Sequence, residues 1–247
     1  MTGPLMKFLS ASLCAVALAA ASPLAAEVTF DAPSGLKSVA FLDGWRMEDG
    51  HRMAALRITL QDGWKTYWRA PGGVGLPAQF DWTGSGNLSA VNFRWPKPSV
   101  YRDDGSVTIG YKHELILPIE LTAKDPYQPI AIHSTVEFGV CAEVCVPASA
   151  RIDAILMPRA EHGKPEILTA LAAEPEPADK AGVSQVKCVV APVEDGFAIT
   201  AHFSTRKPFS PTAVTVFEYP HPDVWIEGTH TNDKGASVTV TSVPPCP

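Results

Sequence analysis

The sequence predicts an all-β protein, because short segments with a period of two follow one another and are divided by turns. Apolar residues alternate with polar ones over residues 56–60, 115–121 and 130–138. A period of two with one apolar face is what a half-buried antiparallel strand needs. Seven or more short strands in about 130 residues are typical of an immunoglobulin-like β-sandwich, which is the fold that we expect for residues 27–157.

Turn-forming residues lie between these strands, and no stretch of residues 27–157 sustains a helical period. Each connection holds glycine, proline or aspartate, which favour tight turns for different steric reasons. The predicted turns are Asp62-Gly63, Pro71-Gly72-Gly73, Gly84-Ser85-Gly86, Asp103-Asp104-Gly105 and Asp125-Pro126.

Composition changes after the sandwich. Residues 158–183 are predicted to form a linker with a short helix over Pro165 to Ala173, which a run of alternating glutamates and prolines ends. Residues 184–247 are predicted to form a second, smaller β module, which has few strands for a sandwich that folds by itself. Either this module packs on the first domain or the chain stops short of a natural boundary. Its predicted strands are 185–190, 196–203, 213–219, 224–227 and 236–242.

The first 26 residues are predicted to be a secretory signal peptide that is removed on export. Lys7 precedes an apolar run from Phe8 to Ala21, and small residues follow it. Because Lys7 is the one charge in this segment, its removal takes the formal net charge from −6 to −7. Export places the mature protein in an oxidising compartment, where disulfides persist.

Several function classes are disfavoured by the composition. Without a cluster of lysine and arginine to neutralise phosphates, nucleic acid is not expected as a partner. The glycine-rich run over residues 71–75 lacks the Lys-Ser/Thr and the helix of a phosphate-binding loop. We assign no cofactor, and we assign no residue as a metal ligand in the favoured function. The aromatic residues that concentrate in one third of the chain are expected to pack in the sandwich core and at its edges; they are Trp64, Tyr67, Trp68, Trp82 and Trp95.

Four cysteines remain after export, and Cys141 and Cys145 are close together. In a regular strand their Cα atoms would be about 13 Å apart, whereas a disulfide needs about 7 Å or less. The segment must therefore fold back as a turn, with Gly139 supplying an unusual φ and Pro147 stopping a central strand. A disulfide that closes so small a loop stabilises a fold weakly, which favours a functional pair over a structural one.

Three functions suit such a pair. The first is dithiol–disulfide exchange, which would make the protein a thiol–disulfide oxidoreductase of the protein-disulfide reductase type. The second is Cu(I) binding in a metallochaperone, for which His113 or His133 would be the third ligand. The third is a non-catalytic adaptor in which the disulfide staples a hairpin. Because Glu137 and Glu143 are the charges nearest in sequence, no strongly lowered cysteine pKa is expected from local residues.

Several motifs in order resemble one known family. They are the aromatic-rich run Gln61 to Arg69, Trp95-Pro96-Lys97-Pro98, Gly110-Tyr111, Leu115 to Ile119 and the segment Cys141 to Pro147. In this order they are similar to the N-terminal periplasmic domain of the DsbD family of thiol:disulfide interchange proteins. Within that family, the chain resembles the variants associated with suppression of copper sensitivity.

The resemblance implies an immunoglobulin-like periplasmic domain with a reversible disulfide at Cys141 and Cys145. It further implies electrons from a membrane-embedded thiol transporter, delivery to periplasmic thioredoxin-fold proteins, and Cys145 as the cysteine that forms the mixed disulfide. The chain departs from better-known members, which space the pair by five residues and shield it with an aromatic cap residue. Here the spacing is three, and Tyr101 would have to serve as cap from a shifted position.

The other two cysteines, Cys188 and Cys246, lie in the second module. A structural disulfide between them would stabilise that module by roughly 4 kcal/mol in the chain-entropy model. The alternative is that Cys246 is unpaired or has a partner beyond the present C-terminus.

Overall fold

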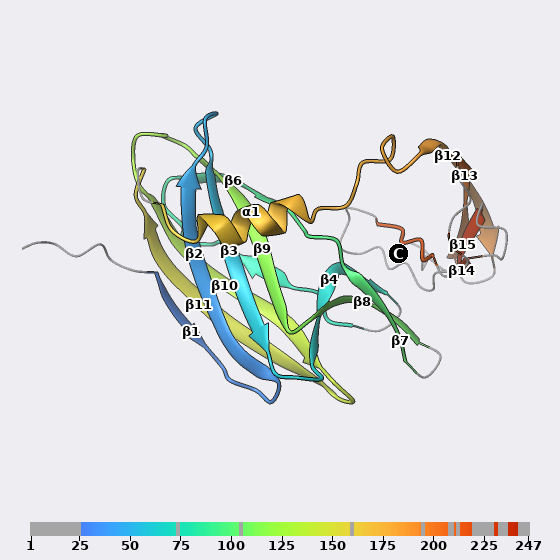
Figure 1. The fold of residues 1–247 in the computed structure, drawn as a ribbon, viewed down its shortest axis with the longest axis horizontal. Helices are drawn as coiled ribbons and strands as arrows, with labels where there is room; N and C mark the ends of the chain where they lie inside the picture. Colours follow the sequence, from blue (N-terminus) through green and yellow to red (C-terminus); the bar gives the residue numbers. More distant parts are fainter. Residues whose placement is uncertain are drawn as a thin grey trace, which may run out of the picture.

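The computed structural model describes residues 26–72, 75–103, 106–158, 161–193, 196–206, 210, 213–218, 230–231 and 237–241. Within these ranges, two antiparallel sheets pack face to face as a sandwich, and a helix and a smaller third sheet follow (Figure 1). This arrangement confirms the predicted fold class. The predicted signal peptide lies almost wholly outside the described residues.

The first sheet holds the cysteine pair. Its strand order is β1 (Glu27–Phe30), β11 (Cys145–Leu156), β10 (Ile130–Cys141), β4 (Lys65–Gly72), β8 (Ser106–Lys112) and β7 (Ser99–Asp103), and β5 (Gln79–Asp81) also pairs with β10. The second sheet has the order β2 (Leu36–Arg46), β3 (Arg52–Leu60), β9 (Glu114–Ala123) and β6 (Leu88–Phe93). All recorded pairings within the two sheets are antiparallel.

The core lies between the two sheets and follows the alternation in the sequence. On β10, Ile132 and Val136 are fully buried, whereas His133 and Glu137 between and beside them are exposed. On the facing sheet, Leu56 and Ile119 are also fully buried. Burying each such side chain contributes roughly 1.5–3 kcal/mol relative to leaving it in water. Even-numbered residues of β10 and β11 therefore face the core, and odd-numbered residues, including both cysteines, face outward.

The helix α1 (Lys164–Ala172) packs against the outer face of the second sheet (Figure 1). Its Ile167 is completely buried in a small cluster with Leu42 and Met53. Just beyond the helix, Arg94 forms an ion pair with Glu174 at 2.6 Å. The helix lies where the sequence predicts one. It packs against the sandwich, so this part of the predicted linker belongs to the folded domain.

The third sheet follows the helix with the order β12 (Val183–Val193), β13 (Gly196–Thr205), β15 (Ser237–Thr241) and β14 (His230–Thr231). The predicted strands 185–190, 196–203 and 236–242 coincide with β12, β13 and β15. The strand predicted at 213–219 is wrong, because residues 213–218 form no ladder. The strand predicted at 224–227 lies outside the described residues. In the described part of the chain, no helix is long and apolar enough to cross a bilayer.

Candidate functional site: a disulfide hairpin with one exposed cysteine

The cysteine pair closes a tight hairpin between the two longest strands. Strand β10 ends at Cys141, β11 begins at Cys145, and the two residues are direct partners in the register. Their Cα atoms are 4.1 Å apart, and their sulfurs form a disulfide. The chain folds back over Ala142, Glu143 and Val144, which confirms the turn that the strand-length argument predicts.

The two sulfurs are in different environments. Cys141 is 1% exposed, whereas Cys145 is exposed and follows Val144, which is 68% exposed. Both side chains lie on the outward face of the first sheet, so the difference comes from what covers Cys141. A reagent that approaches from solvent therefore meets Cys145 first.

Tyr67 on β4 contacts the exposed residue Cys145 through its hydroxyl group. Its Oη lies 3.2 Å from Cys145 Sγ, and the residue is only 2% exposed. Burial raises the pKa of Tyr67 above its usual value near 10. The phenol therefore keeps its proton at neutral pH and can donate it in a hydrogen bond to a Cys145 thiolate.

Glycines make room for the Tyr67 ring. A Cβ atom at Gly139 would lie 3.3 Å from the ring and 2.7 Å from Leu76 Cβ, and one at Gly75 would lie 2.8 Å from the ring. Gly139 does not have a positive φ, so the prediction of an unusual φ there is wrong. Gly139 instead leaves space: a Cβ atom there would overlap Leu76 and press on the Tyr67 ring.

Pro147 also differs from expectation, because it lies within β11, opposite Gly139, and does not stop the strand. The Asp31 N–H donates to the Ser149 carbonyl at 3.0 Å, so β11 directs the backbone groups of its odd-numbered residues to the β1 side. Strand β1 pairs no further than Ala150 of β11. Pro147 is therefore tolerated because its missing N–H falls on an edge without a neighbouring strand.

Two lysines continue the row of the cysteines across the sheet. Lys65 on β4 is the register partner of Cys141, and Lys112 on β8 is the partner of Lys65. Directly opposed residues share a face, so the two ammonium groups lie on the outward face with the disulfide. Lys65 is 8% exposed and donates to Thr108 Oγ1 at 3.1 Å. The local sequence around the cysteines has no cation; the sheet pairs Lys65 with Cys141, and the Lys65 ammonium group lies at Thr108 on β8.

Tyr101, the predicted cap residue, lies over these lysines. Its ring centroid is 4.5 Å from Lys112 Nζ and 5.7 Å from Lys65 Nζ. Tyr101 thus packs against the two lysine side chains on the outward face of the first sheet. A shielding function for Tyr101 stays a prediction.

The histidines considered as third ligands lie elsewhere. His133 precedes Cys141 by eight residues on β10, about 26 Å along a strand, and its Nδ1 is 2.7 Å from Asp153 Oδ1. His113 lies 3.6 Å from Asp62. Among the described residues, neither histidine is placed with the cysteine pair.

Of the second pair of cysteines, one lies within the described residues. Cys188 is exposed on β12, and Cys246 lies outside the described residues. Their disulfide therefore stays a prediction.

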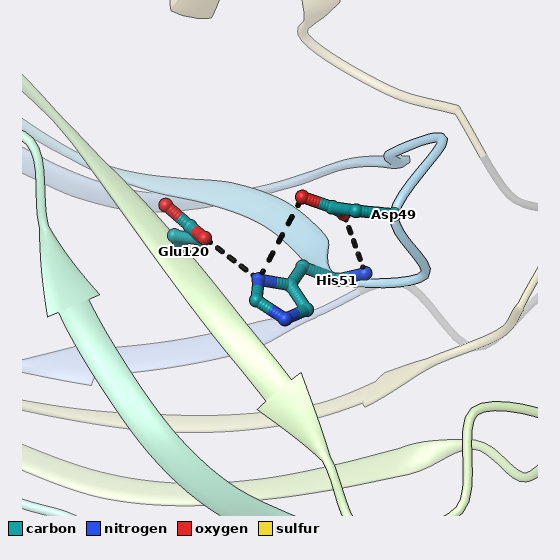
Figure 2. A group of neighbouring side chains, drawn as sticks. All are labelled: Asp49, His51 and Glu120. Carbon is teal, nitrogen blue, oxygen red and sulfur yellow. Dashed lines mark hydrogen bonds and ion pairs between the residues drawn. The ribbon is translucent and has the colours of Figure 1, made fainter.

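A second group of ionisable side chains lies on the second sheet (Figure 2). Asp49, His51 and Glu120 bring candidate metal-ligand atoms within 4.8 Å of one another. His51 Nδ1 is 2.7 Å from Glu120 Oε1, and this hydrogen bond raises the pKa of His51. The other Glu120 oxygen is 3.4 Å from Arg94, which also pairs with Glu174. The group therefore belongs to an ionic chain that fastens the end of the α1 segment to the second sheet.

The fold and the site together define a class of protein: an immunoglobulin-like β-sandwich with a partly exposed disulfide across one hairpin. Residues 38–156 match the family described as thiol:disulfide interchange protein DsbD, N-terminal. This part of the chain belongs to that family, as the motifs in the sequence predict. The match includes Tyr67, Lys65, Cys141 and Cys145.

A solved structure is also similar. The N-terminal periplasmic domain of ScsB from Proteus mirabilis aligns with a TM-score of 0.59 and 23% sequence identity, covering 82% of this chain and 77% of that chain. At this identity the similarity concerns the fold. No curated protein matches the chain.

Proposed function

We propose that this chain is an exported, periplasmic thiol–disulfide interchange protein that passes two electrons through Cys141 and Cys145. The observation that carries the proposal is the asymmetry of the pair, with Cys141 at 1% exposure and Cys145 open to solvent. An inert staple has no need of an exposed sulfur, whereas an exchange protein needs one sulfur to be accessible and the other to resolve the mixed disulfide. Membership of residues 38–156 in the DsbD N-terminal family supports it.

The reaction follows from this asymmetry. A thiolate of the electron donor attacks Cys145 Sγ, the disulfide breaks, and Cys141 leaves as a thiolate that then takes a proton. The second thiol of the donor resolves the mixed disulfide, so the donor becomes oxidised and the pair becomes a dithiol. In the second half, the Cys145 thiolate attacks the acceptor's disulfide, and Cys141 completes the transfer of two electrons and two protons.

One neighbour assists this chemistry. The Tyr67 hydroxyl stabilises the Cys145 thiolate, which is the nucleophile of the second half-reaction.

The family resemblance supplies the partners in the proposal. Electrons come from a membrane-embedded thiol transporter and go to periplasmic thioredoxin-fold proteins, and copper tolerance is the cellular setting. In this scheme residues 1–26 direct export, 27–157 carry the redox site, 158–183 connect, and 184–247 form the second module.

The proposal is tested by trapping partners. Cys141→Ser leaves the exposed Cys145 without its resolving thiol, so mixed disulfides with partners should accumulate on it in the cell. Cys145→Ser leaves only the buried Cys141 and should accumulate few. Equal trapping by both variants would contradict the assigned polarity. A double variant that retains full activity in the cell would instead favour the adaptor.

A further inference from the structure

A groove opens beside Cys145 on the outward face of the first sheet. It has a volume of about 380 Å³ and lies over β10 and β11, between Asp31 at the end of β1 and the segment that leads into β5. The residues that line it are Asp31, Leu76, Pro77, Gln79, Glu137, Phe138, Pro147, Ala148 and Ser149. The groove lies across two strands that already pair with each other, so it offers space for side chains and no free strand edge for a partner's backbone.

Apolar side chains are exposed around this groove and the adjoining turn. Leu76 is 45% exposed, and Val144, next to Cys145, is 68% exposed. Pro147 is exposed as well. Exposed apolar side chains that gather beside a reactive group mark a surface for contact with another molecule.

The distance from the disulfide to the groove is set by the strand. Pro147 lies two residues from Cys145 on the same face of β11, which is about 7 Å. A partner chain in extended conformation also advances about 7 Å in two residues. When the partner's cysteine is bonded to Cys145, its residue two positions away therefore reaches the groove.

The rim of the groove is acidic. Asp31 and Glu137 line it, and Glu143 lies in the turn beside Cys145. Carboxylates around an apolar floor favour a partner segment that is apolar at its centre and basic beside it.

We propose that this groove selects the redox partner: it receives an apolar side chain two residues from the partner's reactive cysteine, with a basic residue next to it. The inference rests on the proposed function and adds the chemistry of the segment that the site accepts.

Exchange with short peptides tests the groove. The reduced full chain is mixed with the disulfide-linked dimer of Lys-Leu-Gly-Cys-Gly-Leu-Lys, and the release of peptide thiol is followed. In each turnover the protein dithiol becomes a disulfide and the peptide disulfide becomes two thiols. The comparison peptides replace both leucines with serine, or both lysines with glutamate. Hydroxyethyl disulfide, which is small and neutral, measures the exchange chemistry alone.

We expect the leucine peptide to react roughly tenfold faster than the serine peptide, the size that burial of one leucine side chain provides. The lysine peptide should exceed the glutamate peptide by roughly threefold, as for an exposed ion pair. Leu76→Ser should abolish the leucine preference, and Glu137→Lys should abolish the lysine preference. The matched controls Leu168→Ser, on the exposed face of α1, and Glu176→Lys, on an exposed residue beyond the end of α1, should preserve both.

The outcomes separate the two levels of the proposal. If hydroxyethyl disulfide does not oxidise the reduced protein, the proposed function fails. If it does, but all peptides react at one rate or the preferences survive Leu76→Ser and Glu137→Lys, the groove inference alone is overturned.

Discussion

The contact between Tyr67 and Cys145 gives a sharp prediction. Tyr67→Phe removes one oxygen, which lies 3.2 Å from Cys145 Sγ, and keeps the ring in the space between Gly75 and Gly139. The fold should therefore be unchanged, while the Cys145 thiolate loses a hydrogen-bond donor.

The magnitude follows from the energy of that bond. A hydrogen bond to a charged group contributes roughly 1.5–3 kcal/mol, and we take the lower end because sulfur is a weak acceptor. At 1.36 kcal/mol per pKa unit, the Cys145 pKa should rise by about one unit in the variant. Below that pKa the thiolate fraction falls about tenfold, but its intrinsic nucleophilicity rises by about threefold. The net rate of attack should therefore fall by about threefold.

The measurement uses Cys141→Ser as the background, so that Cys145 titrates alone. The rate of alkylation by iodoacetamide is measured against pH with Tyr67 and with Phe at that position. Tyr111→Phe is the control, since that hydroxyl is also buried but donates to the Pro96 carbonyl at 2.8 Å. An unchanged midpoint in Tyr67→Phe, or an equal shift in the control, would refute the assigned contact.

Three further predictions concern stability. Gly139→Ala should destabilise the fold by roughly 1–3 kcal/mol through overpacking, whereas Gly86→Ala, where a Cβ meets ordinary contact, should cost less in a denaturant titration. Ile167→Ala should cost roughly 2–4 kcal/mol, and Leu168→Ala, at 48% exposure, should change the unfolding midpoint little. The hydrogen bond to Glu120 raises the pKa of His51 in the folded protein above 6.5. Protonated His51 therefore stabilises the folded state below pH 6.5, and this contribution is lost as the pH rises through the pKa of the folded protein. His51→Gln should therefore destabilise at about pH 5.5 and be neutral at about pH 9; the same deficit at both would contradict this.

The fold was largely predictable because alternation is a local signal. The period of two over residues 130–138 already assigns Ile132 and Val136 to the core, and the structure agrees. The hairpin at the cysteines was predictable for a similar reason: a strand of fixed rise cannot bring Cys141 and Cys145 into bonding distance.

The surroundings of the site depend on strands distant in sequence. Tyr67 and Lys65 are more than seventy residues before the cysteines, so only strand pairing brings them there. The composition of the aromatic run that contains Tyr67 predicts only that these rings are packed, and it gives no sign that one hydroxyl contacts a cysteine. The sequence around Gly139 suggests a special backbone angle, but the residue instead leaves space for Leu76 and Tyr67, which are distant in sequence.

The reduction potential of the Cys141–Cys145 pair tests the central claim most directly. The full chain is equilibrated with glutathione and dithiothreitol buffers of defined ratio, and the oxidised fraction is measured. An exchange protein should have a potential above about −300 mV, within reach of redox partners. A potential well below about −300 mV, as in inert structural disulfides, would contradict the account.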